Sequence, residues 1–355
     1  MSKRIRVLVV DDSLFMRAAI AKTLATPAFE VVGQAKDGKD ALAQIAKLKP
    51  DAVTMDFNMP GMNGADTVRE LMRTQPTPVV MFSAHTKQGA KETFDALAAG
   101  AVDFVTKPAG EVSVDLSKIA TELITKLTAA SQARPRVAVT PIPSRPSGQM
   151  AAFGATSSQR GTIPGVGIGT TSTRVCIIGI STGGPAALSE IIPALPETLK
   201  LAIVVVQHMP AGFTAALAER LNATSKVSVH EAKAGDRPMP GTVLIAPGDR
   251  HLEFDDRGTI VLTDGALVNG CRPAADVTMQ SAARVFGRRS LAVVMTGMGK
   301  DGAAGALAIK RADGKTMAQD QATSVIYGMP KAAIDVGAID EVAALADIPA
   351  WLRYA

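Results

Sequence analysis

The sequence predicts an α/β protein built on two parallel β-sheets, and two observations carry this prediction. Within residues 1–126, five short apolar segments alternate with helical patterns, which is typical of an open parallel sheet covered on both faces. After a stretch rich in Pro, Gly, Ser and Thr, the alternation resumes and continues through the rest of the chain. We therefore divide the 355 residues into domains at 1–126 and 173–355, joined by a flexible, basic linker at 127–172.

Apolar, β-branched runs mark the strands of both domains. In the first domain they are predicted at residues 6–10, 29–35, 52–56, 78–83 and 103–106. In the second domain the strand candidates are residues 174–180, 201–207, 290–297 and 314–320. Residues 241–264 break this rhythm, because their short strands and turn residues predict an antiparallel hairpin excursion. We expect a doubly wound, mostly parallel, Rossmann-like sheet in the second domain.

The formal net charge of +5 suggests nucleic-acid binding, but its distribution argues against it. Residues 1–126 hold 16 Lys+Arg and 15 Asp+Glu, residues 127–172 hold four arginines and no acid, and residues 173–355 hold 18 of each, which gives +1, +4 and 0. A nucleic-acid-binding domain would concentrate the excess charge on one folded face. We therefore expect no nucleic-acid partner.

Targeting signals and cysteine usage indicate the compartment. No apolar run approaches the roughly 20 residues that span a bilayer, and the N-terminal residues lack the cleavage site of a signal peptide. With Cys176 and Cys271 as the two cysteines, a disulfide framework is not expected. The sequence thus predicts a cytoplasmic protein that is not embedded in a membrane.

Charged and polar side chains collect at the predicted strand ends of the first domain. Asp11 and Asp12 follow the first strand, Asp56 ends the third, and Ser83 and Lys107 follow the fourth and fifth. In a parallel sheet these positions share one edge. Packed carboxylates repel one another unless a cation lies among them, and hard oxygen ligands suit Mg²⁺. This arrangement suits phosphoryl transfer onto Asp56, with Lys107 paired to the new phosphate.

A G-x-S-x-G pattern at residues 179–183 marks the start of the second domain. There a strand turns sharply into a helix and presents Ser181 at the sheet edge, where helix N–H groups can meet an oxyanion. The stretch alone equally fits a helix-capping serine or a Gly-rich phosphate loop. A Rossmann nucleotide site is disfavoured, because the spaced third glycine and the downstream ribose acid are missing.

Two further strand ends supply the partners of a nucleophilic serine. His208 closes residues 201–207, and Asp301 lies just beyond the strand at 290–297. Three strand ends thus deliver the three roles of a hydrolytic triad, Ser181, His208 and Asp301. The order Ser, His, acid differs from the Ser, acid, His of α/β-hydrolases.

The other three histidines are poorer candidates for the base. His85 belongs to the first domain, and His230 and His251 fall in the hairpin excursion without a matching acid at a strand end. No His/Cys cluster has zinc spacing, so metal-assisted hydrolysis is not expected.

The acids, hydroxyl and lysine of the first domain, in that order, make it resemble a response-regulator receiver domain of two-component signalling. The resemblance implies a flavodoxin-like fold and Asp56 as the phosphoacceptor. It implies Mg²⁺ ligands at Asp12, Asp56 and the backbone carbonyl of Asn58, with Asp11 assisting. It also implies switch roles for Ser83 and Phe104 and a phosphate-pairing role for Lys107.

Five segments of the second domain, in order, resemble the catalytic domain of the chemotaxis methylesterases. They are "GISTGGP", "QHMPAGFT", "APGDRHL", "NGCRPAAD" and "MTGMGKDG". The resemblance implies a serine esterase, activated by phosphorylation, that hydrolyses glutamate γ-methyl esters on chemoreceptors and deamidates receptor glutamines in chemotactic adaptation. The esterase chemistry would need no cofactor. Thr182 and the backbone N–H of Met298 are implied as oxyanion donors.

Two departures from the family pattern lie beside the triad. Cys271 stands where the family usually has a histidine, and "RPAAD" replaces the commoner "RPSVD". We expect neither change to affect the triad. Both concern the substrate groove, where Arg272 and Asp276 are candidates for positioning receptor helices.

The domain order suggests regulation and partners. We expect a chemotaxis histidine kinase as phosphodonor and methyl-accepting chemoreceptors as substrate. We hypothesise that the unphosphorylated receiver covers the Ser181 cleft and that phosphorylation of Asp56 favours an open form, because the tether lets even a weak interface act. The alternatives are an output domain that only binds, and a hydrolase acting on a small ester or amide.

Overall fold

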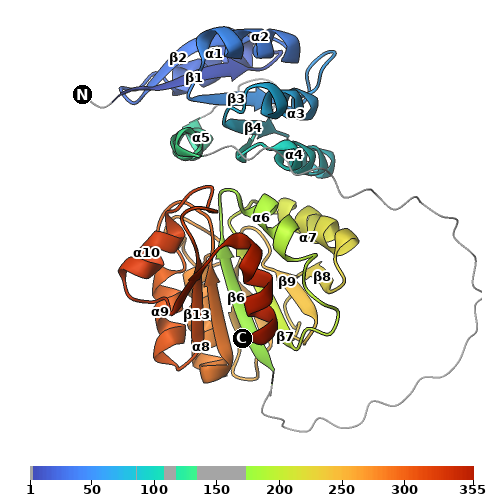
Figure 1. The fold of residues 1–355 in the computed structure, drawn as a ribbon, viewed down its shortest axis with the longest axis vertical. Helices are drawn as coiled ribbons and strands as arrows, with labels where there is room; N and C mark the ends of the chain where they lie inside the picture. The colour runs from blue at the N-terminus through green and yellow to red at the C-terminus, as the bar shows by residue number, and fades with distance from the viewer. Residues whose placement is uncertain (1–2, 85, 108–116, 134–172) are drawn as a thin grey trace, which may run out of the picture.

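Figure 1 shows the computed structural model, in which two α/β domains lie one above the other. The structure describes residues 3–84, 86–107, 117–133 and 173–355. Each domain has a parallel sheet with helices on both faces, so the predicted fold class is confirmed.

The first domain holds a five-stranded sheet in the order β2-β1-β3-β4-β5, with every pair parallel. Its strands are β1 (Ile5–Val10), β2 (Phe29–Ala35), β3 (Ala52–Asp56), β4 (Val79–Ser83) and β5 (Asp103–Thr106). Its helices are α1 (Leu14–Thr23), α2 (Gly38–Leu48), α3 (Gly64–Thr74), α4 (Lys87–Ala99) and α5 (Ser117–Gln132). All five strands were predicted from their apolar runs. The strand order reverses beside β1, which opens a crevice between the ends of β1 and β3.

The second domain holds a seven-stranded sheet in the order β14-β13-β12-β6-β7-β9-β8, again with every pair parallel. Its strands are β6 (Arg174–Ile180), β7 (Leu201–Gln207), β8 (Ser228–Glu231), β9 (Thr242–Ile245), β12 (Ser290–Val294), β13 (Lys315–Gln319) and β14 (Glu341–Ala343). Its helices are α6 (Gly184–Ile191), α7 (Phe213–Thr224), α8 (Ala275–Phe286), α9 (Ala303–Arg311), α10 (Met329–Asp335) and α11 (Ile348–Tyr354). The strand β6 lies between β12 and β7, so the topological switch point of this sheet falls at its end.

The hairpin excursion is smaller than the sequence predicts. Only β10 (His251–Phe254) and β11 (Ile260–Thr263) form the antiparallel pair. The segment β9 instead joins the main sheet parallel to β7, because three of its four side chains are buried in the core. His230 is likewise outside the hairpin, on the edge strand β8. The short edge strands β8 and β14 carry too little periodicity to be predicted.

The predicted boundary between the first domain and the linker lies six residues too early. Residues 127–132 form the last turns of α5, since Leu127 and Ala130 are fully buried against the first domain. Residues 134–172, most of the predicted linker, lie outside the described residues.

Alternating side chains along β6 build the two cores of the second domain. Cys176, Ile178 and Ile180 pack under α6, α7 and α11 on one face of the sheet. Val175 and Ile177 pack under α8, α9 and α10 on the other face. Burial on both faces explains the unbroken apolar run that ends at Ser181. Among the described residues, no helix has the length and apolar character needed to cross a bilayer.

Candidate active site and phosphorylation site

The corner after β6 presents Ser181 at the switch point. The backbone N–H of Ser181 donates to the Thr296 carbonyl at 3.0 Å, which ties the corner to the loop after β12. The helix α6 begins at Gly184 with Gly183 as its N-cap, so Ser181 is not the capping residue. Gly183 has φ +79°, and a side chain there would meet Val325 at 2.7 Å. The corner therefore requires glycine and leaves the serine hydroxyl free of a capping role.

The structure brings His208 and Asp301 together. His208 follows β7, and its backbone N–H donates to the Ile180 carbonyl at 3.1 Å. Its side chain is 11% exposed, and Nε2 lies 2.7 Å from Oδ2 of Asp301. Burial alone would lower the pKa of His208, but the hydrogen bonds with Asp301 and Cys271 reverse this and raise it to about 9.

Asp301 is buried at the N-terminus of α8. Its oxygens accept hydrogen bonds from the backbone N–H groups of Ala275 at 2.6 Å and Asp276 at 3.1 Å, and from Nδ2 of Asn269 at 3.2 Å. Burial would raise the pKa of this carboxyl, but the hydrogen bonds from His208 and the helix lower it below its usual value. Asp301 is thus a fixed anion that accepts a hydrogen bond from Nε2–H of His208.

The second ring nitrogen of His208 faces Cys271. Nδ1 lies 3.5 Å from Sγ of Cys271, whose side chain is half-buried. Within the described part of the chain, the Ser181 hydroxyl makes no hydrogen bond to His208. The structure thus gathers the three predicted triad residues at adjacent strand ends, with Ser181 not yet joined to the base.

The two expected oxyanion donors flank the serine corner. Thr182 is buried, and its hydroxyl donates to Oδ2 of Asp103 in the first domain at 2.6 Å. Met298 follows Gly297, where an added Cβ would lie 2.8 Å from Cβ of Ser181. The glycine therefore lets the loop after β12 pass directly along the serine.

The two expected groove residues make their hydrogen bonds within the second domain. Asp276 is 6% exposed and accepts hydrogen bonds from Gly305 N at 2.7 Å and Asn269 Nδ2 at 2.8 Å. Arg272 Nη1 donates to the carbonyls of Asp264 and Gly265. The Asp276 carboxylate is hydrogen-bonded inside the domain, behind Asp301, and the groove role of both residues stays a prediction. Arg272 is partly exposed and braces a loop.

The acids of the first domain converge as the sequence predicts. Ligand oxygens of Asp11, Asp12 and Asp56 all lie within 4.8 Å of one another. Lys107 Nζ lies 2.8 Å from Oδ1 of Asp56 and 3.1 Å from Oδ2 of Asp11. Burial and, to a smaller extent, the charge of Asp11 raise the pKa of Asp56 to about 6 against the attraction of Lys107. Three close carboxylates with one ammonium group leave negative charge unbalanced, which fits a hard divalent cation such as Mg²⁺.

The other predicted residues of this domain, Asn58, Ser83 and Phe104, lie in three different surroundings. Asn58 is exposed in the loop after β3. The Ser83 hydroxyl donates to the Gly89 carbonyl at 3.0 Å and accepts from Thr93 Oγ1 at 2.6 Å, so it is bound to α4. Phe104 is 2% exposed and faces the second domain.

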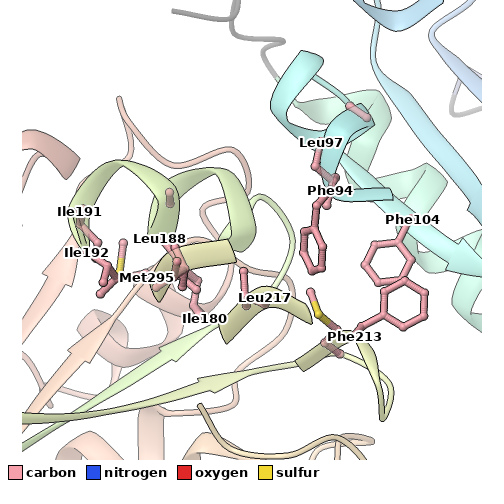
Figure 2. Close-up of a cluster of buried hydrophobic side chains, with 14 of the residues drawn as sticks. Phe94, Leu97, Phe104, Ile180, Leu188, Ile191, Ile192, Phe213, Leu217 and Met295 are labelled. Atoms are coloured by element: carbon pink, nitrogen blue, oxygen red, sulfur yellow. The ribbon is translucent and has the colours of Figure 1, made fainter. Parts of the chain in front are cut away.

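Aromatic, hydrogen-bond, charged and helix-packing contacts join the two domains. The rings of Phe104 and Phe213 stack with centroids 4.6 Å apart, next to Phe94 of α4 (Figure 2). Asp103, the residue before Phe104, accepts the hydrogen bond from Thr182. Arg220 Nη1 pairs with Oδ1 of Asp95 at 3.0 Å. The helix α4 packs against α6 and α7 (Figure 1). The first domain therefore touches the residue next to Ser181.

A pocket of about 780 Å³ lies between α5 and the second domain. It is lined from α5 by Thr128 and Gln132 and from the second domain by Met298, Tyr327 and Lys331. None of the triad residues lines it. Its position shows that the domain interface is not close-packed along α5.

Sequence reasoning missed three residues of the site. Asn269 holds both Asp301 and Asp276, and it has φ +53° in a tight turn before Gly270. The Asn-Gly pair is a turn signal, but it does not say what the side chain binds. Asp103 and Phe213 meet residues of the other domain, and no local pattern predicts such contacts.

The fold and these two sites define a class: a response regulator whose output domain carries a serine-hydrolase constellation. Sequence-family profiles agree, since the response regulator receiver domain matches residues 7–116 and the CheB methylesterase domain matches residues 176–352. The chain belongs to the CheB methylesterase family.

Relatives match over nearly the whole chain. The protein-glutamate methylesterase/protein-glutamine glutaminase of Symbiobacterium thermophilum is 47% identical over 95% of this chain and 93% of its own length. The protein of the same description from Pyrococcus abyssi is 44% identical over 98% and 92%. The crystal structure of the Thermotoga maritima CheB methylesterase catalytic domain matches with a TM-score of 0.50 and 44% identity, over 52% of this chain and 99% of that one. Both domains are therefore shared with methylesterases.

Proposed function

We propose that Ser181, His208 and Asp301 carry the methylesterase and glutaminase chemistry of this family. The substrates are glutamate γ-methyl esters and certain glutamines on the cytoplasmic helices of methyl-accepting chemoreceptors, and the reaction serves chemotactic adaptation. The observation that carries the proposal is the 2.7 Å bond between His208 and Asp301 beside the Ser181 corner.

The hydrogen bond between Asp301 and Nε2 of His208 supports a route for each proton. The Asp301 carboxylate only accepts, so Nε2 of His208 carries its hydrogen and Nδ1 is the basic nitrogen. Ser181 Oγ attacks the ester or amide carbonyl while Nδ1 accepts the hydroxyl proton. The imidazolium then gives this proton to the departing methanol or ammonia, and water hydrolyses the acyl-enzyme by the reverse route.

The oxyanion of each tetrahedral intermediate needs donors on the opposite side. We assign this role to Thr182 and to the backbone N–H of Met298, which flank the corner. Removing one such donor typically lowers turnover by about 10²–10³-fold. The Thr182 hydroxyl donates its hydrogen bond to Asp103 in this structure, so this donor is turned away from the substrate.

We propose that the first domain inhibits the second until Asp56 is phosphorylated. The phosphodonor is a chemotaxis histidine kinase, and Mg²⁺ held by Asp11, Asp12 and Asp56 would neutralise charge during transfer. A phosphate on Asp56 would compete for Lys107, which lies three residues beyond Phe104 and its stack on Phe213. Weakening that stack and the Asp103–Thr182 bond would release Thr182 and open the cleft.

Methanol release from a methylated chemoreceptor fragment tests the function. Wild type, Ser181→Ala and a matched Ser189→Ala control, whose serine is exposed on α6, are assayed with and without a small-molecule phosphodonor and Mg²⁺. Release should vanish in Ser181→Ala, survive in Ser189→Ala, and rise with phosphodonor only when Mg²⁺ is present. Release that persists in Ser181→Ala would contradict the nucleophile, and no release from wild type would point to another ester or amide.

A further inference from the structure

Two side chains, Cys271 and Ser181, compete for the lone pair on Nδ1 of His208. Asp301 accepts the hydrogen on Nε2, which leaves Nδ1 as the basic nitrogen. Sγ of Cys271 lies 3.5 Å from that Nδ1, within reach of a hydrogen bond to sulfur. Ser181 needs the same nitrogen to lose its proton. In the described structure the Cys271 thiol, and not the Ser181 hydroxyl, is hydrogen-bonded to Nδ1.

The thiol is held there by the turn that also orients the acid. Val268 and Cys271 form an antiparallel bridge around Asn269 and Gly270, which have φ +53° and +80°. The Asn269 side chain in the middle of this turn donates to Asp301. One short turn thus places a donor on the acid and a thiol on the base, so the Cys271 contact is built into the frame of the site.

We propose that Cys271 is a positioning residue for His208, holding Nδ1 away from Ser181 in the receiver-covered form and releasing it when substrate enters. The proposal rests on the proposed function, because it takes His208 as the base for Ser181. Cys271 gives its proton to Nδ1 and becomes a thiolate beside an imidazolium. The same proton returns to sulfur when Nδ1 is released. No covalent bond between the residues forms, and no oxidant is needed.

The charges around His208 favour the paired form. Asp301 faces Nε2 from the loop after β12, Cys271 faces Nδ1 from its turn, and Asp276 of α8 lies behind Asp301. Burial would lower the pKa of His208, whereas Asp301 and Cys271 both raise it. A protonated His208 cannot accept a second proton, so the thiol lowers the fraction of active base near neutral pH.

The first test measures kcat/KM for methylated receptor from pH 6 to 9.5 in wild type, Cys271→Ala and Cys271→Ser. Removing the thiol should raise kcat/KM at pH 7 by about two- to tenfold, which corresponds to the net free energy of one ordinary hydrogen bond. It should also move the acid limb of the profile to lower pH. Serine cannot ionise in this range, so Cys271→Ser should show the same direction of shift. Profiles that superimpose on wild type would overturn the proposal, as would activity lost in both variants.

A second test needs no receptor and separates this proposal from the proposed function. The rate of Cys271 alkylation by iodoacetamide at pH 6.5 is compared in the full-length wild type, His208→Ala and Asp301→Asn. Both variants should react at least about threefold more slowly, because each removes stabilisation of the thiolate. The buried Cys176, whose pKa burial raises, is the internal control and should stay unlabelled while the fold is intact. Equal alkylation rates in folded protein would overturn the proposal even if methanol release is normal.

Discussion

The two sheets place their chemistry at the same kind of position under opposite electrostatic conditions. At the end of β3, Asp56 is buried beside Asp11, and its pKa rises to about 6 despite Lys107. In the loop after β12, Asp301 is also buried, yet its pKa falls because His208 and the α8 backbone donate to it. Burial acts in the same direction on both carboxyls, so the neighbours decide the outcome.

This difference explains what each site requires from outside. The first site has more carboxylates than cations and can use both a metal ion and an incoming phosphate. The second site balances its own charge, because Asp301 stabilises the imidazolium formed on His208. Asp12 is exposed to solvent, whereas Thr182 is covered by Asp103 of the other domain. The acid cluster of the first domain is reached by solvent at Asp12, whereas the serine site of the second domain is in contact with the first domain.

The largest expected effect comes from changing the acid of the second site. Asp301→Asn should lower kcat by about 10⁴-fold, since the amide no longer holds the Nε2–H tautomer of His208. Methanol release from methylated receptor measures this. Asp335→Asn, on the exposed side of α10, is the matched control and should leave kcat unchanged. A loss below tenfold in Asp301→Asn would contradict the triad assignment.

The raised pKa of His208 predicts a steep pH dependence. Only neutral His208 can accept the Ser181 proton, so kcat/KM should rise with pH up to about 9. Between pH 6 and 8 the rise should be about 100-fold, tenfold for each pH unit. Ser181→Ala in the same buffers measures background ester hydrolysis. A kcat/KM that stays constant above pH 7 would contradict the raised pKa of His208.

Removing the first domain should remove the inhibition. A chain lacking residues 1–172 should hydrolyse methylated receptor about ten- to a hundredfold faster than the unphosphorylated full-length protein, which is the usual range of coupling between sites. A related catalytic domain has been crystallised by itself, which supports the folding of this fragment. Unchanged basal activity would reject the inhibitory arrangement and leave the triad untouched.

A single aromatic side chain should account for part of that inhibition. Phe213→Ala removes the stack on Phe104 and should raise basal activity by about three- to tenfold, from the loss of one aromatic pair and its buried area. The same methanol assay, without phosphodonor, measures it. Phe15→Ala is the matched control, because Phe15 is 60% exposed on α1 and should have no effect. Equal behaviour of the two variants would show that the stack does not hold the domains together.

The smallest effect is expected from the outer ion pair. Arg220 and Asp95 are 36% and 47% exposed, so solvent screens their attraction and Arg220→Ala should change basal activity by less than about twofold. The small difference from wild type should disappear at 0.5 M salt. A change larger than that of Phe213→Ala would reverse the order of the interface contacts.

Much of the fold could be predicted because strong apolar runs specify buried strands. The five strands of the first domain and four strands of the second were predicted from such runs. The failures occurred where the pattern is short or depends on partners. β9 joined the main sheet because β7 was available to pair with it, and residues 127–132 continued α5 because a core was there to cover.

By itself the sequence determined which side chains stand at the strand ends, since period and turn residues locate where each parallel strand stops. Ser181, His208, Asp301 and the acids around Asp56 follow from that rule. The tertiary structure decided which of them touch and what lies beside them. The Cys271 thiol on Nδ1, the Asn269 bond to Asp301 and the Asp103 bond to Thr182 join residues 63, 32 and 79 positions apart. Such contacts depend on loop paths and domain packing, which local periodicity does not encode.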